Sequence, residues 1–302
     1  MAEHIGFIGL GIMGTPMALN LAAAGHALHI YARRPEAMSA LTEAGATPCD
    51  SPADVARHAG IVFTMLSDTP DVEQLLLGAE PGDPNCVLAG CKPGSIVVDM
   101  TTMSPSATRR IAARLAEADV AMLDAPVSGG DIGARDGTLS IMVGGPRRTF
   151  DRVRPLFEVM GRNIVHVGDS GAGQVCKACN QIVVGQTIAG VGEALLLAEA
   201  AGVDGAKVRE ALLGGFAGSR ILEVHGRRMI DGDYQPGFKA ALHQKDMRIV
   251  QETAHELGIG LPCAALVAQL LNALVGQGDG GLDSAAIHVA QRRLNGRDVD
   301  PT

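Results

Sequence analysis

The stretch GFIGLGIMGTPMALNL, residues 6–21, decides the fold of the amino-terminal half of the chain. A short apolar run that begins at His4 predicts a buried strand, and it leads directly into a GxGxxG turn. An apolar helical pattern follows at once and closes at Gly25, after which residues 27–32 predict a second strand. The order strand, GxGxxG, helix and strand within about thirty residues lifts this motif above a chance match. The sequence therefore predicts a Rossmann-type dinucleotide-binding domain.

The three glycines of the turn have separate physical roles. Gly9 permits the tight turn, Gly11 lets the backbone approach a pyrophosphate, and Gly14 lets the helix pack against the strand. The pyrophosphate would then accept hydrogen bonds from free N–H groups at the helix start. A merely glycine-rich turn is the alternative, and the flanking strands argue against it. The cofactor-binding residues predicted in this turn are Gly9, Leu10, Gly11, Ile12, Met13 and Gly14.

The end of the second predicted strand bears on the choice of cofactor. NAD-binding sites usually offer an acidic side chain to the ribose hydroxyls there. This chain instead has Tyr31, Ala32, Arg33 and Arg34, with no acid before Glu36. The two arginines could bind a 2′-phosphate through charge-assisted hydrogen bonds. The alternative is a solvated pair of loop charges. The sequence favours NADP(H) and leaves NAD(H) open.

Alternating strands and helices continue to about residue 168. Further strands are expected at residues 61–66 and 95–100, and helices at 52–58, 71–77 and 105–118. Ligands gather at strand ends in such sheets, so polar residues there are expected beside the nicotinamide. The alternative for each of them is loop polarity or helix capping. The residues concerned are Leu66, Ser67, Asp71 and Thr102.

A Ser-Gly-Gly turn follows the predicted strand at residues 120–124. In Ser128, Gly129 and Gly130, a hydroxyl and successive backbone N–H groups can converge on an anion such as a carboxylate. The alternative is an ordinary turn, because serine and glycine are common in loops. One more strand is expected from about residue 137 to 145, and a last one at 163–167.

From residue 169 onward the sequence predicts only helices. We therefore expect a dinucleotide-binding domain at 1–168 and an all-helical substrate and oligomerisation domain at 169–302, joined by one long helix from Gln174 to about Ala201. Further helices are expected at residues 203–213, 220–230, 238–257 and 264–276. A helical domain built on one long helix tends to bury an apolar face against a partner chain, so a homodimer or homotetramer is expected.

The long helix begins with GAGQVCKACNQ, residues 171–181. Lys177, Asn180 and Gln181 share one helix face, because they are spaced three and four residues apart. Burial would lower the proton affinity of Lys177 and make it a candidate acid/base. The alternative is a surface lysine near a helix start. Further along, the pair Lys245 and Asp246 would mean little if it were exposed.

Composition excludes several classes of function. A net charge of -8 and only 3% aromatic residues argue against nucleic-acid binding. No apolar run is expected to reach membrane-spanning length and the start has no signal-peptide pattern, so a cytoplasmic protein without membrane contact is expected. Cys176 and Cys179 form a lone CxxC, which we interpret as packing residues. No metal-ligand cluster is expected.

Four blocks together resemble the signature blocks of the β-hydroxyacid dehydrogenases, the family related to 3-hydroxyisobutyrate dehydrogenase. They occur in family order from residue 6 to residue 247. The block GGFAGSRILEVHG, residues 214–226, resembles most the branch that acts on tartronate semialdehyde. The four blocks are GFIGLGIMGTPMALNL (6–21), DAPVSGGDIGARDGTLSIMVGG (124–145), GAGQVCKACNQ (171–181) and PGFKAALHQKDM (236–247).

The resemblance implies a role for each matching residue. Lys177 matches the catalytic lysine, Asn180 the substrate-orienting amide, and residues 128–130 the substrate carboxylate site. Lys245 matches a lysine that reaches the cofactor or closes the cleft. Leu66, Ser67, Asp71 and Thr102 match further cofactor contacts.

The chain departs from the family pattern at two positions. Ser67 stands where many members have proline, which would loosen that loop. Ala32 stands where many have Asp or Asn, which favours binding of a 2′-phosphate by Arg33.

The implied activity is nicotinamide-dependent reduction of tartronate semialdehyde (2-hydroxy-3-oxopropanoate) to glycerate, with Lys177 as general acid/base. The alternative substrate is that of 3-hydroxyisobutyrate dehydrogenase or another small semialdehyde. An alternative of a different class is a non-catalytic NADP-binding sensor, but it needs neither Lys177 nor Asn180.

Overall fold

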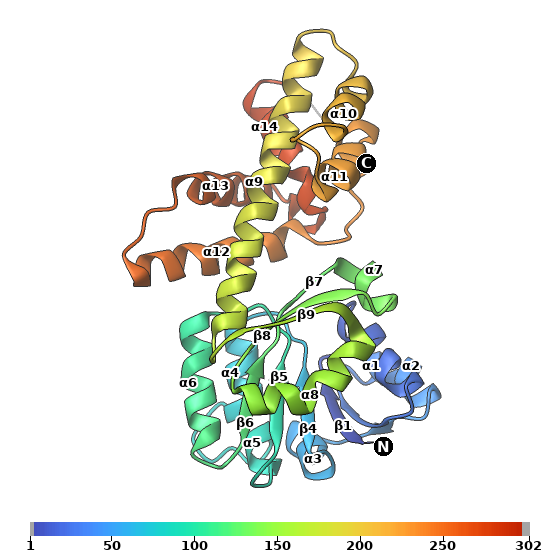
Figure 1. The fold of residues 1–302 in the computed structure, drawn as a ribbon, viewed down its shortest axis with the longest axis vertical. Coiled ribbons are helices and arrows are strands. Elements are labelled where there is room, and N and C mark those ends of the chain that lie inside the picture. The colour runs from blue at the N-terminus through green and yellow to red at the C-terminus, as the bar shows by residue number, and fades with distance from the viewer. Residues whose placement is uncertain (1–2, 298–302) are drawn as a thin grey trace. The chain divides into compact units, whose positions relative to one another are not determined.

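The computed structural model describes residues 3–297 (Figure 1). The chain divides into two compact units, Met1–Lys177 and Ala178–Thr302. The first contains the sheet and the second is helical, which confirms the predicted fold class of a Rossmann-type domain followed by an all-α domain. The predicted domain boundary after residue 168 stays a prediction.

The strands of the first unit form one nine-stranded sheet in the order β3-β2-β1-β4-β5-β6-β8-β7, with β9 paired to β8. Neighbouring strands from β3 to β6 are parallel, whereas β8 runs antiparallel to β6 and β7. The order 3-2-1-4-5-6 is that of dinucleotide-binding sheets. The strands are β1 (His4–Ile8), β2 (Ala27–Tyr31), β3 (Thr47–Pro48), β4 (Ile61–Thr64), β5 (Ile96–Asp99), β6 (Ala121–Asp124), β7 (Val127–Ser128), β8 (Leu139–Gly144) and β9 (Gly161–Gly168).

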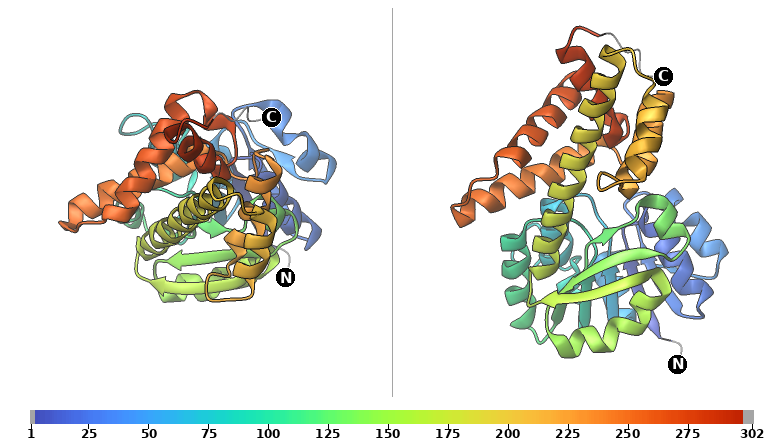
Figure 2. Two further views of the ribbon diagram at one scale, coloured as in Figure 1. Left: turned by 90° about the horizontal axis from the view of Figure 1, so that it is seen from above. Right: turned by 45° about the horizontal axis from the view of Figure 1, so that its top comes forward.

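Helices cover both faces of this sheet (Figures 1 and 2). Side chains alternate along each strand, so Phe63 packs on one face with α1 and α8, and Val62 packs on the other with α3, α4 and α6. Both faces are apolar, as expected of a parallel sheet. The helices of this unit are α1 (Gly14–Ala23), η1 (Pro35–Met38), α2 (Ser39–Glu43), α3 (Pro52–His58), α4 (Thr69–Leu77), α5 (Val87–Gly90), α6 (Pro105–Ala116), α7 (Gly130–Arg135) and α8 (Arg147–Met160).

The second unit packs its helices around the greater part of α9 (Ala172–Ala200). Gly185 allows a close approach, since a Cβ there would lie 2.9 Å from a methyl group of Val267. Asp283 holds the start of α12 by accepting hydrogen bonds from the backbone N–H groups of Gly237 and Phe238, each at 3.0 Å. The remaining helices are α10 (Gly205–Leu213), α11 (Arg220–Asp231), α12 (Ala240–Leu257), α13 (Pro262–Gly276), η2 (Asp279–Gly281), η3 (Ser284–Ala286) and α14 (Ile287–Leu294).

The helix α9 corrects one expectation. Among the helices of residues 3–297, α9 alone is both long enough and apolar enough to cross a membrane, judged by length and composition only. From the sequence, no apolar run was expected to reach that length. Core helices of water-soluble proteins meet the same criterion, and α9 contributes Ile188 to the core of the second unit.

Candidate active site

The glycine-rich turn between β1 and α1 has the backbone that its sequence predicts. Gly9 has a φ of +98°, and a Cβ there would lie 2.2 Å from the carbonyl oxygen of Met65. A Cβ on Gly14 would lie 2.0 Å from the carbonyl oxygen of Gly9. A side chain at Gly9 would therefore clash with the segment after β4, and one at Gly14 would separate α1 from the end of β1. Gly11 differs, since a Cβ there meets no atom within 4 Å.

The start of α1 differs from the capped starts of α3, α4 and α6. Ser51, Asp68 and Ser104 cap α3, α4 and α6 by accepting hydrogen bonds from backbone N–H groups. The start of α1, after Met13, has no side-chain cap and no acidic residue in its first turn. Such an end leaves N–H groups and a positive partial charge for an anion. It therefore suits the pyrophosphate of a dinucleotide.

A buried carboxyl group joins the ends of β4 and β5. Asp99 accepts a hydrogen bond from the hydroxyl of Thr64 at 2.8 Å, and the hydroxyl of Thr101 accepts one from the backbone N–H of Leu66 at 2.9 Å. Burial raises the pKa of Asp99 to about 7, although hydrogen bonds from Thr101 and Thr64 oppose that rise. This network joins the two loops that carry the predicted cofactor residues, Leu66 after β4 and Thr102 after β5. Sequence reasoning missed Asp99 and Thr101, although a carboxyl group at the end of a wholly apolar strand was the available signal.

Two predicted cofactor residues lie close together beyond β2 and β4. A guanidinium nitrogen of Arg33 is 3.9 Å from a carboxylate oxygen of Asp71, and the Arg33 side chain is 82% exposed. An ion pair of that length and exposure contributes little stability. Ser67 is exposed, while Leu66 and Thr102 are partly buried. The structure thus brings Arg33 and Asp71 together at the end of the sheet where cofactors bind.

The Ser-Gly-Gly turn connects β7 to α7. Gly129 has a φ of +138° and Gly130 a φ of +63°, so both residues adopt a backbone that favours glycine. Ser128 pairs with Ser140 of β8, which fixes the turn at the edge of the sheet. The two glycines therefore give the turn a backbone that residues with a side chain rarely adopt.

The carboxylate of Asp124, at the end of β6, holds the start of α9. It accepts hydrogen bonds from the backbone N–H groups of Gly171 at 2.8 Å and Gln174 at 3.0 Å. The side-chain amide of Gln174 in turn donates to the carbonyl oxygen of Thr101 at 2.7 Å and accepts from the backbone N–H of Met103 at 3.1 Å. The first turn of α9 is therefore tied to β6 and to the loop after β5.

Close backbone contacts leave no room for a side chain at this attachment. A Cβ on Gly144 would lie 2.6 Å from a carboxylate oxygen of Asp124, and one on Gly173 would lie 2.4 Å from the carbonyl oxygen of Met142. Lys177 follows three residues after Gln174 and is only 7% exposed. Lys177 is therefore buried, and the alternative of a surface lysine near a helix start is wrong.

Burial raises the pKa of Asp124 to about 6, even though the backbone N–H groups of Gly171 and Gln174 lower it. The group that holds the start of α9 by hydrogen bonds is therefore titratable. Sequence reasoning missed it because Asp124 was treated only as the end of a strand.

In the second unit, polar side chains of α9 and α12 form one network of hydrogen bonds and an ion pair. Asn180 donates to the side-chain oxygen of Gln181 at 2.8 Å, and Gln181 donates to a carboxylate oxygen of Asp246 at 2.6 Å. The other carboxylate oxygen lies 2.8 Å from the ammonium nitrogen of Lys245. The side chain of Asp246 is 3% exposed and that of Lys245 is 14% exposed, so this pair is buried rather than a solvated surface pair. Two predicted site residues, Asn180 and Lys245, therefore belong to one network.

The six cysteines are all free. Cys176 is partly buried, as a packing residue would be, but Cys179 is exposed. The interpretation of Cys179 as a packing residue is therefore wrong, because its position on α9 faces away from the core of the helix bundle.

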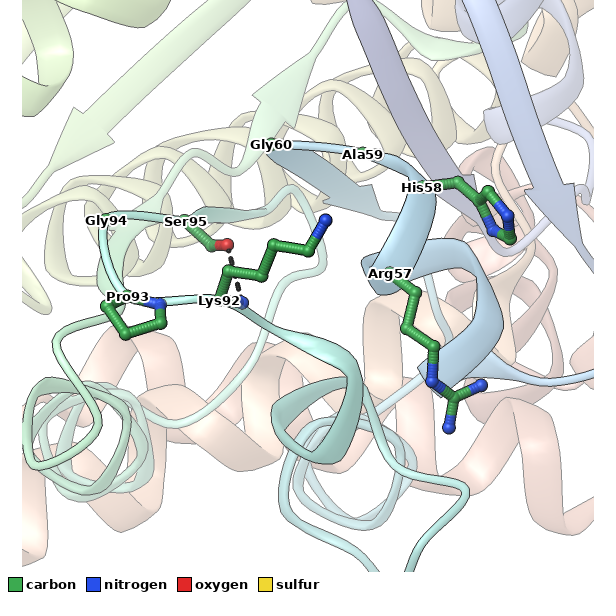
Figure 3. Close-up of a pocket in the computed structure, with 8 residues that line it drawn as sticks. All are labelled: Arg57, His58, Ala59, Gly60, Lys92, Pro93, Gly94 and Ser95. Atoms are coloured by element: carbon green, nitrogen blue, oxygen red, sulfur yellow. Dashed lines mark hydrogen bonds between the residues drawn. The ribbon is translucent and has the colours of Figure 1, made fainter.

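A surface pocket of about 250 Å³ lies away from these residues (Figure 3). Gly60 precedes β4 and Ser95 precedes β5, so the pocket lies at the amino ends of these strands. Cofactors bind at the carboxyl ends of such sheets. No predicted site residue lines the pocket, whose lining is Arg57, His58, Ala59, Gly60, Lys92, Pro93, Gly94 and Ser95.

Two family models match this chain, one over each part. Residues 4–168 match the family model for the NAD-binding domain of 6-phosphogluconate dehydrogenase. Residues 171–290 match the model described as NAD-binding of NADP-dependent 3-hydroxyisobutyrate dehydrogenase.

Curated relatives match the chain along nearly its whole length. The 2-hydroxy-3-oxopropionate reductase of Escherichia coli K12 is 50% identical over 94% of this chain and 95% of its own. The 3-hydroxyisobutyrate dehydrogenase of Pseudomonas aeruginosa is 38% identical over 97% of this chain and 99% of its own. Among solved structures, a Mycobacterium tuberculosis 3-hydroxyisobutyrate dehydrogenase with L-serine is similar at a TM-score of 0.87 and 31% identity, covering 97% of this chain and 100% of that one.

Proposed function

Because the chain belongs to the β-hydroxyacid dehydrogenase family and is an oxidoreductase that binds a nicotinamide dinucleotide, we propose that it reduces tartronate semialdehyde to glycerate. The observation that carries this proposal is the 50% identity to the E. coli reductase over nearly the full length of both chains. The proposed substrate, tartronate semialdehyde, is the same compound as 2-hydroxy-3-oxopropionate. The product glycerate differs from it by one hydride and one proton. The reverse reaction would oxidise the terminal hydroxyl of glycerate.

In the proposed reduction, hydride passes from the nicotinamide to the aldehyde carbon of the substrate. Lys177, as an ammonium group, donates a proton to the oxygen on which negative charge develops. In the reverse direction neutral Lys177 accepts the hydroxyl proton. Its burial and the fixed start of α9 support this role, since a proton donor acts only from within hydrogen-bond reach of the reacting oxygen.

Two further groups would position the substrate. The turn at Ser128, Gly129 and Gly130 would bind its carboxylate, as the two left-handed glycines support. Asn180 would hold a polar group of the substrate, oriented by its hydrogen bond to Gln181. Lys245, fixed by Asp246, would contact the cofactor.

For the cofactor we propose a preference for NADP(H) over NAD(H). Gly9, Leu10, Gly11, Ile12, Met13 and Gly14 would bind the pyrophosphate, and Leu66, Ser67, Asp71 and Thr102 the nicotinamide side. Arg33 and Arg34 would bind the 2′-phosphate, and the weak pair between Arg33 and Asp71 costs little to break.

The second candidate activity is that of a 3-hydroxyisobutyrate dehydrogenase, which the P. aeruginosa relative and the M. tuberculosis structure support. Its substrate carries a methyl group where tartronate semialdehyde has a hydroxyl. A site that hydrogen-bonds the hydroxyl rejects the methyl analogue by about 10⁴-fold, whereas an apolar site separates the two by only about 10²-fold.

Steady-state kinetics with both semialdehydes, each with NADH and NADPH, test the proposal. The expected result is a kcat/KM for tartronate semialdehyde that exceeds that for the methyl analogue with either cofactor. A higher kcat/KM for the methyl analogue would transfer the assignment to the second candidate. If neither aldehyde leads to consumption of the nicotinamide cofactor, the result would favour a binding protein without activity on these acids.

The partners and location remain part of this proposal. We propose a cytoplasmic homodimer or homotetramer that binds a small hydroxy acid or semialdehyde, without nucleic-acid or membrane partners. The acidic balance of the chain supports the exclusion of polyanions.

A further inference from the structure

A group of three potential metal ligands lies on the first unit, outside the site described above. The ligand atoms of His29, Cys49 and His58 all lie within 4.8 Å of one another. His29 is the middle residue of β2, Cys49 follows β3, and His58 is the last residue of α3. The sequence analysis expected no such cluster, because these residues are separated in sequence and only the fold brings them together.

Alternation along β2 directs His29 toward this group. Leu28 and Ile30 belong to the core on the face of α1 and α8, so His29 between them faces the side of α3. The Cys49 thiol belongs to the core on that same side. The backbone N–H of Cys49 donates to the carbonyl oxygen of Ile30 at 2.8 Å, which fixes the cysteine beside β2.

Each histidine has one ring nitrogen held by a hydrogen bond and the other left for a ligand. Nε2 of His29 lies 3.1 Å from Nδ1 of His4, while Nδ1 of His29 is buried without a hydrogen-bond partner. Nδ1 of His58 lies 2.8 Å from the backbone carbonyl oxygen of Asp54, so Nε2 is its ligand atom. Metal-binding histidines are typically oriented in this way through their second nitrogen.

The spacing of the groups also fits one ion. The ring centroids of His29 and His58 are 5.2 Å apart. Two imidazoles on one tetrahedral zinc ion have centroids about 5 Å apart, given zinc–nitrogen bonds of about 2 Å. A carboxylate oxygen of Asp54 lies 3.5 Å from Nδ1 of His58, so Asp54 helps to orient the ring through the nitrogen that does not bind the ion. Figure 3 shows the His58 ring directed away from the cationic side chain of Lys92.

We propose that His29, Cys49 and His58 bind one divalent transition-metal ion of the zinc type. Two imidazole nitrogens and one thiolate suit Zn²⁺ and Co²⁺ and exclude Mg²⁺ and Ca²⁺, which require oxygen ligands. On binding, the thiol of Cys49 gives its proton to the solvent and the sulfur bonds to the metal. The ion links β2, the segment after β3 and the end of α3.

The test is a titration of the metal-depleted full chain with Co²⁺ followed by absorbance, and then with Zn²⁺. The expected result is one equivalent of Co²⁺ with a thiolate-to-cobalt charge-transfer band, displaced by Zn²⁺. The variant Cys49→Ser should lose the band. The variant His58→Gln, at an exposed side chain, should weaken Co²⁺ binding about tenfold or more.

The matched control is Cys263→Ser, which alters an exposed thiol on α13 and should leave the titration unchanged. Absence of the band in the parent chain would overturn the proposal. So would a band that survives Cys49→Ser, or Co²⁺ affinity that is unchanged in His58→Gln. None of these outcomes depends on the substrate, so the result is separate from that of the proposed reaction.

Discussion

The carboxylate of Asp124 accepts a hydrogen bond from the backbone N–H of Gln174 at 3.0 Å, and this contact joins the end of β6 to the first turn of α9. The second oxygen accepts from Gly171 at 2.8 Å. Because Lys177 lies less than one turn further along α9, the position of its ammonium group depends on this attachment. Asp124 is therefore a positioning residue for the proposed proton transfer.

Replacement of Asp124 by Asn tests that dependence. The amide keeps one acceptor oxygen and replaces the other by a donor, so one N–H of α9 loses its partner. We expect kcat to fall by about tenfold, as for an unpaired buried group of about 1–3 kcal/mol, with a smaller change in the cofactor KM. The control is Asp151→Asn on the exposed surface of α8. An unchanged kcat and an unchanged pH profile in Asp124→Asn would show that the contact has only a structural role.

Asp99 is expected to make the protein less stable as the pH rises. Its pKa is raised by burial to about 7, against an unfolded value of about 4, so the native state holds the extra proton between these values. The free energy of unfolding therefore falls as the pH rises from about 4 to about 7. Asp99→Asn should remove this contribution and raise the melting temperature at pH 8 relative to the parent, with a smaller difference at pH 5.

Thermal unfolding of both proteins across that pH range measures the effect. A parent and variant whose difference in melting temperature is the same at pH 5 and pH 8 would contradict the prediction. Burial also raises the pKa of Asp124, to about 6, so that residue should leave part of the pH dependence in the variant.

Asp283 is expected to act in the opposite direction in the second unit. Burial alone would raise its pKa, but hydrogen bonds from His225 and from the backbone N–H groups of Ala285 and Phe238 lower it to about 2. Its contribution to stability is present above the unfolded pKa of about 4 and is lost as the pH falls toward 2.

Asp283→Ala should therefore destabilise the protein at pH 7 by on the order of 3 kcal/mol, because it leaves buried donors without a partner. Urea unfolding at pH 7 measures this loss, and Asp204→Ala, at the exposed start of α10, provides a comparison with a smaller loss. Equal losses in the two variants would refute the special role of Asp283.

Arg33→Ala should distinguish the two cofactors. If its guanidinium binds the 2′-phosphate, the KM for NADPH should rise roughly ten- to hundredfold while the KM for NADH changes little, since charge-assisted hydrogen bonds contribute about 1.5–3 kcal/mol. Arg57→Ala, at the amino ends of the strands, is the matched control. A similar rise in KM for both cofactors would count against 2′-phosphate binding by Arg33.

The sequence predicted the elements that follow regular patterns. The prediction of the helix Pro52–His58 is confirmed residue for residue, and the helix predicted at residues 105–118 is α6, which begins at Pro105. The helix α8 was missed, because Arg and Asp dominate its exposed face and Pro155 lies inside it. The helix α14 lies in the part of the chain predicted to be all helical, but no separate helix was predicted at its residues.

The candidate site could be predicted only where a local motif carries it. Lys177 and the glycine-rich turn belong to continuous stretches of sequence, so they were found. Asp124, Gln174 and Thr101 are joined by hydrogen bonds between segments about fifty to seventy residues apart, and only folding reveals such pairings.

The most direct test of the proposed chemistry is the rate of cofactor oxidation with tartronate semialdehyde by Lys177→Ala, together with its cofactor affinity. We predict that kcat falls at least about a hundredfold, as for a lost general acid, while the Kd for the reduced cofactor stays close to that of the parent. Lys207→Ala, an exposed lysine of α10, should keep full activity. Near-normal kcat in Lys177→Ala would contradict the assignment of Lys177 as the proton donor.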